Sequence, residues 1–188
     1  MAQSSELFIR ELTHILVKTG ALPISEERPL DEAFKKSAHD RYEMFLLEEG
    51  LVQPDVLLKA MSLCYKVPSF DAADYFFEYP LLHFFPKDFL LNNGIIPAEL
   101  DEDILIIVAA DPSDPELLAK IGEFVSYDIQ FCVGIYQDIC DAVEEYYDRA
   151  LTQDEEVEEQ SDSDNEMEAY GFEIEEEDTG VSEDIDEI

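Results

Sequence analysis

Acidic residues are distributed so unevenly along this chain that only its first 150 residues can build a hydrophobic core. Residues 151–188 contain 18 Asp and Glu and no Lys or Arg, which is half of the net charge of −36. The few apolar residues there stand isolated among carboxylates, so this segment cannot bury enough surface to offset the entropy of ordering it. We therefore predict a disordered acidic tail at 151–188.

The pattern of residues 1–66 predicts a sub-domain of four helices built from a duplicated helical hairpin. Apolar residues recur three or four apart over Glu6–Lys18, as in an amphipathic helix. Gly20 and Gly50 each follow such a helix, and aligning them superimposes the two halves with an offset of 30 residues. The other helices are expected from Ser25, over Asp40–Glu49 and from Pro54.

Residues 67–150 predict a small sheet with helices packed on it, in the order β-β-α-β-α. The second strand is nearly all apolar, which is typical of a central strand buried on both faces. Together with the helical sub-domain, this order predicts an α+β fold. Strands are expected over Gly94–Leu100, Asp103–Ala110 and Tyr127–Gly134, and helices over Pro86–Leu91, Pro115–Phe124 and Tyr136–Arg149.

Charge and composition exclude several classes of partner. The strongly negative balance disfavours direct DNA or RNA binding, because phosphates demand a basic face. No apolar run reaches the roughly 18 residues that a membrane span needs. The three cysteines are odd in number and show no C-x-x-C spacing, which favours reduced thiols in a cytoplasm. A basic protein partner remains compatible with this balance.

No pattern in the sequence predicts a catalytic or a metal site. His14, His39 and His83 are scattered, and none has a neighbour at convincing ligand spacing. Asp111 and Asp114 each precede a proline, and a loop that caps the following helix explains them better than a pair of catalytic carboxylates. We therefore expect neither a catalytic residue nor a metal ligand.

Several strings of residues resemble one protein family. These are Phe-Leu-Leu-Glu-Glu-Gly-Leu-Val at 45–52, Asn-Gly-Ile-Ile-Pro at 93–97, and Ile-Ile-Val-Ala-Ala-Asp-Pro at 106–112. Their order and spacing, together with Ile139-x-x-Ala-Val-x-x-Tyr-Tyr147, are similar to the N-terminal domain of type II secretion and type IV pilus assembly ATPases. The resemblance covers roughly Leu7 to Ala150.

The resemblance implies a non-enzymatic docking or regulatory adaptor in the bacterial cytoplasm. In the family, this domain is joined by a linker to the motor and contacts the cytoplasmic part of an inner-membrane assembly protein. The expected partner is that protein or an assembly ATPase, which would recruit the chain to the inner membrane. No G-x-x-x-x-G-K-[ST] phosphate loop occurs in the sequence, so we expect no ATP hydrolysis by these residues.

The resemblance also implies an alternative function as a cyclic di-GMP sensor. A subset of the family binds this ligand through two tandem motifs similar to R-L-G-x-x-L-[VIL]-x-x-G-[LI]-[ILV]. In the second copy Tyr42 and Glu43 replace Leu and Gly, and in the first copy Glu11 and Thr13 replace Arg and Gly. The candidate nucleotide-binding residues are Arg10, Leu12, Leu16, Gly20, Arg41, Leu46, Leu47 and Gly50. No other cofactor is expected.

Two further groups of residues are candidates for binding a protein partner. An aromatic cluster between the two sub-domains is expected mainly to pack in the core, with an exposed groove as the alternative. The tail is interpreted as a linker, and a short interaction motif at 167–174 is the alternative reading. The candidates are Phe76, Phe77, Tyr79, Phe84, Phe85, Tyr170 and Phe172.

Overall fold

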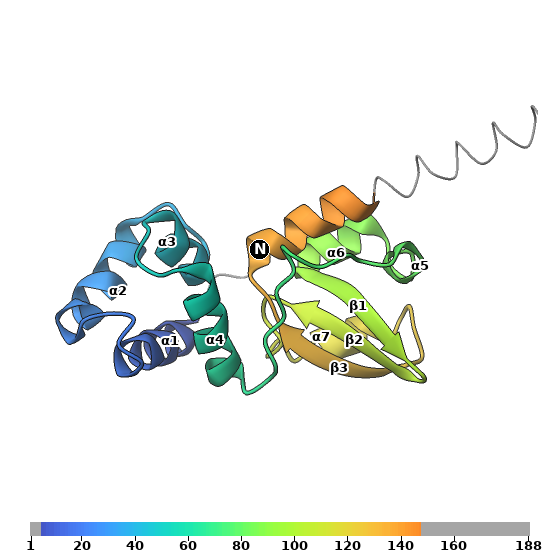
Figure 1. The fold of residues 1–188 in the computed structure, drawn as a ribbon, viewed down its shortest axis with the longest axis horizontal. Helices are drawn as coiled ribbons and strands as arrows, with labels where there is room; N and C mark the ends of the chain where they lie inside the picture. The colour runs from blue at the N-terminus through green and yellow to red at the C-terminus, as the bar shows by residue number, and fades with distance from the viewer. Residues whose placement is uncertain (1–4, 148–188) are drawn as a thin grey trace, which may run out of the picture. The chain divides into compact units, whose positions relative to one another are not determined.

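The computed structural model describes residues 5–147, which belong to one compact unit. The predicted tail at 151–188 lies outside these residues. The described part of the chain combines helices with one three-stranded sheet, which confirms the α+β fold class. Figure 1 follows the elements along the chain.

The first part of the chain forms the four helices that the sequence predicts. Ser5 caps the first of them, because its side chain accepts a hydrogen bond from the amide of Phe8 at 3.2 Å. The third helix begins two residues later than expected, since Arg41 has an extended backbone and serves as its N-cap. The elements are α1 (Glu6–Lys18), η1 (Ile24–Glu26), α2 (Glu27–Lys36), α3 (Tyr42–Glu48) and α4 (Pro54–Tyr65).

The two helical hairpins end their first helices in the same way. Gly20 and Gly50 both adopt positive φ, at 79° and 65°, a conformation that glycine reaches without a steric penalty. In each case the amide after the glycine bonds back to a leucine carbonyl: Ala21 to Leu16 at 2.9 Å and Leu51 to Leu46 at 3.0 Å. The 30-residue repeat is therefore a repeat of local structure.

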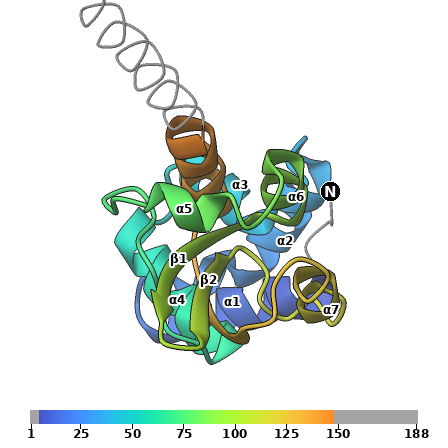
Figure 2. The ribbon, with the colours of Figure 1, turned by 90° about the vertical axis from the view of Figure 1, so that its right-hand side faces the viewer.

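The second part of the chain forms the sheet, with strand order β1-β2-β3. β1 and β2 are antiparallel, whereas β2 and β3 are parallel. The nearly all-apolar strand is the central one, as predicted. α5 and α6 both pack against β1 (Figure 2). The elements are α5 (Tyr79–Leu82), α6 (Lys87–Asn93), β1 (Ile95–Asp101), β2 (Ile104–Ala109), α7 (Leu117–Ile121), β3 (Asp128–Val133) and a last described helix at 136–147.

In this second part of the chain, α5 and α7 differ most from the prediction. α5 was not expected, because its four residues are too few to show a helical period. α7 is shorter than Pro115–Phe124, because carboxylates hold the preceding loop in turns. Asp111 accepts hydrogen bonds from the amide and hydroxyl of Ser113 at 3.1 and 2.6 Å, and Asp114 accepts one from the amide of Glu116 at 2.9 Å.

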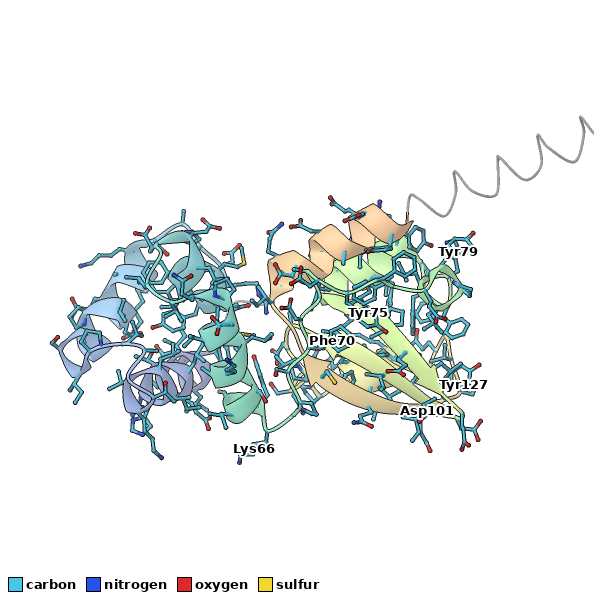
Figure 3. All side chains as sticks on the ribbon, in the orientation of Figure 1. Lys66, Phe70, Tyr75, Tyr79, Asp101 and Tyr127 are labelled. Carbon is cyan, nitrogen blue, oxygen red and sulfur yellow. The ribbon has the colours of Figure 1, made fainter. Side chains whose placement is uncertain are left out.

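Buried apolar residues form two clusters, one among the helices and one around the sheet. Val133 of β3 belongs to the helical cluster, so the two parts share core residues. The division at residues 66 and 67 stays a prediction. Figure 3 shows the chain from Lys66 to Phe70 that links α4 to the sheet elements, with Phe70 edge-on to Tyr75 at 4.8 Å.

Candidate ligand and docking sites

The leucines of the candidate nucleotide motif are core residues. Leu12, Leu16 and Leu46 have no exposed surface, and Leu47 is partly buried. Gly20 and Gly50 are exposed turn residues with nothing within 4 Å of where a side chain would begin. These positions are explained by packing and by turn geometry, whether or not a ligand binds.

The two candidate arginines do not line the same cavity. Arg10 is exposed on α1, in a shallow depression that it shares with Leu7, Glu11 and His14. Arg41 lines a cavity of about 520 Å³ to which α1 contributes no residue. Its other lining residues are Ser5, Asn92, Asn93, Asp111, Ser113, Asp114, Pro115, Glu116, Leu117, Lys120 and Tyr136.

Glu43 holds the guanidinium group of Arg41. The Glu43 side chain is 1% exposed and its Oε1 accepts a hydrogen bond from Nε of Arg41, which is itself 16% exposed. Glu43 Oε2 is buried and has no hydrogen-bond partner among the described residues. Burial without compensation is costly for a carboxylate, so this ion pair holds Arg41 strongly. The residue that replaces the motif glycine thus binds the motif arginine.

The other side of Arg41 rests on an aromatic ring. Its guanidinium carbon lies 4.5 Å from the ring centroid of Tyr136, a cation–π contact. Tyr136 in turn lies against Gly94, where a β-carbon would come within 2.9 Å of the ring. Arg41 therefore joins the start of α3 to the helix at 136–147. Burial raises the pKa of Tyr136, so its phenol stays protonated at neutral pH.

Two more of the four departures from the motif, Thr13 and Tyr42, form a hydrogen bond with each other. Thr13 is buried and donates its hydroxyl proton to the carbonyl of Ile9 at 2.7 Å. Its oxygen lies 2.8 Å from the hydroxyl of Tyr42, which must then be the donor, because a threonine hydroxyl has only one proton. Burial raises the pKa of Tyr42 and keeps that proton in place. The replacements in both copies therefore form one hydrogen-bonded contact.

The cationic and acidic groups in the Arg41 cavity are largely paired. Lys120 lies 3.5 Å from Asp114 and 3.4 Å from Glu116. Asp111 accepts two hydrogen bonds from Ser113. Burial raises the pKa of the partly buried Tyr65, and the carboxylate of Asp111 raises it further. A phosphate entering this cavity would meet two occupied cations and several carboxylates.

The cysteines and histidines occupy structural positions. All three cysteines are free thiols, and burial, with help from Glu11 and Asp111, raises the pKa of Cys64 to about 11. His39 lies 2.7 Å from Glu48, and His83 stacks on Tyr147 with ring centroids 4.7 Å apart. Residues 5–147 contain no cluster of potential metal ligands, and no helix in that range is both long and apolar enough to cross a membrane.

Of the five candidate aromatic residues that the structure describes, two are core residues, two are partly buried and one is exposed. Phe77 and Phe85 are each 1% exposed, so in this structure neither contributes to an outer surface. Phe76 is the exception, with 73% of its surface exposed and its ring edge-on to Tyr146 at 5.4 Å. Tyr79 and Phe84 are partly buried, whereas Tyr170 and Phe172 lie outside the described residues.

Sequence reasoning did not identify Tyr136 or Lys120, or the ion pair of Glu43 with Arg41. Glu43 carried a usable signal, because it lies three residues before the buried Leu46 and so shares its helical face. A carboxylate on a buried face needs a cation, and Arg41 is the nearest. Tyr136 carried no such signal, since 95 residues separate it from Arg41.

The comparisons with known proteins agree with one another. Residues 65–153 match the family model of the MshEN domain. The chain is 24% identical over 136 residues to the type IV pilus assembly ATPase PilB of Myxococcus xanthus (strain DK1622), an alignment that covers 72% of this chain. It spans only 24% of that relative's length.

Solved structures of two proteins have the same fold. A structure of MshE with cdg superimposes with a TM-score of 0.59 at 19% identity, covering 72% of this chain and 98% of that one. The N-terminal domain of XpsE gives a TM-score of 0.55 at 20% identity, covering 78% and 99%. Residues 65–153 are thus similar to MshEN domains, and the chain resembles the N-terminal domains of type II secretion and type IV pilus assembly ATPases.

Proposed function

We propose that these residues act as a non-enzymatic docking domain that binds a protein of a secretion or pilus assembly machinery. The observation that carries the proposal is the fold match, which covers 99% of the solved N-terminal domain of XpsE. The sequence of these 188 residues contains no phosphate loop. The partner is the cytoplasmic part of an inner-membrane assembly protein or an assembly ATPase. The net charge of −36 favours a basic surface on that partner.

The exposed Phe76 offers a way to test this docking. Binding of the purified chain to the purified cytoplasmic region of the assembly protein, and to the assembly ATPase of the same bacterium, is measured by biolayer interferometry. We expect micromolar or tighter binding to one of them, with loss of affinity for Phe76→Ser. Leu118→Ser is the matched control, because Leu118 is also exposed, at 56%, but lies on α7. Absence of binding to both proteins contradicts the proposal.

A second candidate is a cyclic di-GMP sensor. The similarity to a structure of MshE with cdg, read as cyclic di-GMP, and the position of Arg41 in a cavity favour it. The ion pair of Arg41 with Glu43 disfavours it, because the carboxylate already occupies the guanidinium that a phosphate would need. Titration of cyclic di-GMP into the double variant Tyr42→Leu/Glu43→Gly separates the two views. Binding by the variant alone means that these replacements abolished an earlier site.

A further inference from the structure

Two outward-facing residues of the β3 backbone have no hydrogen-bond partner within residues 5–147. The amide of Asp128 donates to the carbonyl of Asp103 at 2.9 Å and that of Gly134 donates to Ala109 at 3.1 Å, so even-numbered residues of β3 face β2. The backbone groups at positions 129, 131 and 133 therefore face the outer edge. Val133 is paired there, because its amide donates to Pro68 at 2.8 Å and its carbonyl accepts from Phe70 at 2.9 Å. Ile129 and Phe131 have no such partner within residues 5–147.

This edge lacks several of the usual protections against strand addition, namely proline, lysine and a register shift. Natural sheets block their edges with proline, lysine, bulges or covering helices. β1, the opposite edge, has Pro97, a register shift between Pro97 and Glu99, and α5 and α6 packed against it. β3 has neither proline nor lysine. α4 packs against β3, and Val133 at the end of the strand belongs to the helical cluster, whereas the side chains of Ile129 and Phe131 are partly buried against the core of the sheet. Two amides and two carbonyls thus stay available to another extended chain.

Acidic groups lie at one end of this edge, where β3 begins. Asp101, Glu102 and Asp103 form the turn between β1 and β2, and Asp128 begins β3 beside them. All four are exposed, and none has an ion-pair partner among the described residues. Figure 3 labels Asp101 and Tyr127 at this end of the sheet. Ile104, 41% exposed, lies opposite Asp128 in the β2–β3 register.

We propose that the open edge of β3 binds an extended, basic segment of the partner protein as a fourth strand. Main-chain hydrogen bonds to Ile129 and Phe131 supply the pairing, and Lys or Arg side chains meet the acidic groups at the strand's start. The residues after position 150 of this chain are a poor occupant, because they carry 18 acidic residues and no basic one before residue 188. A second copy of this chain is a poor occupant for the same reason, because it would bring another Asp128 and the same negative net charge to the edge. This inference rests on the docking function and specifies the chemistry of the partner.

The probe for this edge is a synthetic ten-residue peptide of alternating Lys and Val, blocked at both ends, titrated into the ¹⁵N-labelled chain. We expect the amide resonances of Ile129 and Phe131 to shift and their hydrogen exchange to slow. A Glu-Val peptide and a Lys-Val peptide methylated on alternate backbone nitrogens should bind at least tenfold more weakly. Shifts confined to other residues, equal binding of the methylated peptide, or dimerisation of the chain through β3 overturn the proposal.

Two variants test the same edge without reliance on one substitution. Ile129→Pro removes an outward amide, and Asp128→Lys reverses an exposed charge without touching the core. Each variant should lower the affinity for the Lys-Val peptide at least tenfold. The control variant Asp55→Lys, on α4, should leave that affinity unchanged. If a purified machinery protein binds both edge variants as well as it binds the original chain, the docking function is supported but the proposed binding at the edge of β3 is wrong. If the peptide binds the edge but neither machinery protein does, the edge stands and the proposed function fails.

Discussion

The two helical hairpins share an apolar frame and turn geometry but differ at the end where the motif arginine belongs. In the first copy, Glu11 and Arg10 are exposed on α1. In the second copy, Arg41 is nearly buried and held between Glu43 and Tyr136. Packing preserves leucines and turns preserve glycines, while polar positions are free to find partners within the chain. A motif can therefore persist in outline after its ligand contacts are replaced.

The largest difference between the copies should appear on removal of the arginines. Arg41→Ala leaves the carboxylate of Glu43 buried and unpaired, and should cost about 3–5 kcal/mol of unfolding free energy. Arg10→Ala should change it by about 0.5 kcal/mol or less, because Arg10 is exposed. Urea unfolding of both variants measures these costs. Equal costs would mean that the ion pair does not stabilise the second hairpin.

Truncation of the equivalent leucines should show that the apolar frame is shared. Leu16 and Leu46 are both fully buried, so each change to alanine should cost about 2–5 kcal/mol, through lost burial and the cavity left behind. The same urea experiment measures both. A cost below about 1 kcal/mol at either position would show that the two copies do not pack alike.

Substitutions of Thr13 and Tyr42, which form the contact between the two copies, should be strongly coupled in their effect on stability. Thr13→Val removes the hydrogen bond that the buried hydroxyl of Tyr42 donates to Thr13 and should cost about 1–3 kcal/mol of unfolding free energy. Tyr42→Phe should cost less, and the double variant should cost less than the sum of the single changes. A double-mutant cycle from chemical unfolding gives the coupling. Simple additivity would contradict the hydrogen bond.

The smallest effects should come from the two turn glycines. Gly20→Ala and Gly50→Ala each place a residue with a β-carbon at positive φ, which should lower the free energy of unfolding by about 1–2 kcal/mol. The new β-carbon would have no atom within 4 Å, so no steric clash adds to this cost. Gly94→Ala should cost more, because its β-carbon would also meet the ring of Tyr136. Thermal unfolding of the three variants gives the order. A cost at Gly20 equal to that at Gly94 would contradict the packing of Tyr136.

The sequence predicted the periodic elements well and the tertiary polar contacts poorly. The long period of α1, the apolar run of β2 and the glycines after α1 and α3 each reflect local physics that repeats along the chain. The start of α7 depended on two carboxylate turns in the loop before it, and α5 was too short to show a period. The contact of Arg41 with Tyr136 joins residues 95 positions apart, and no local pattern encodes it.

The most direct test of this account is isothermal titration of cyclic di-GMP into the purified chain at moderate salt. Because Glu43 occupies Arg41 and the first copy offers only an exposed arginine, we expect no heat of binding at high micromolar ligand. Micromolar or tighter binding that Arg41→Lys abolishes in a folded chain would contradict the account. The ion pair would then open to admit a ligand, and these residues would act as a nucleotide sensor.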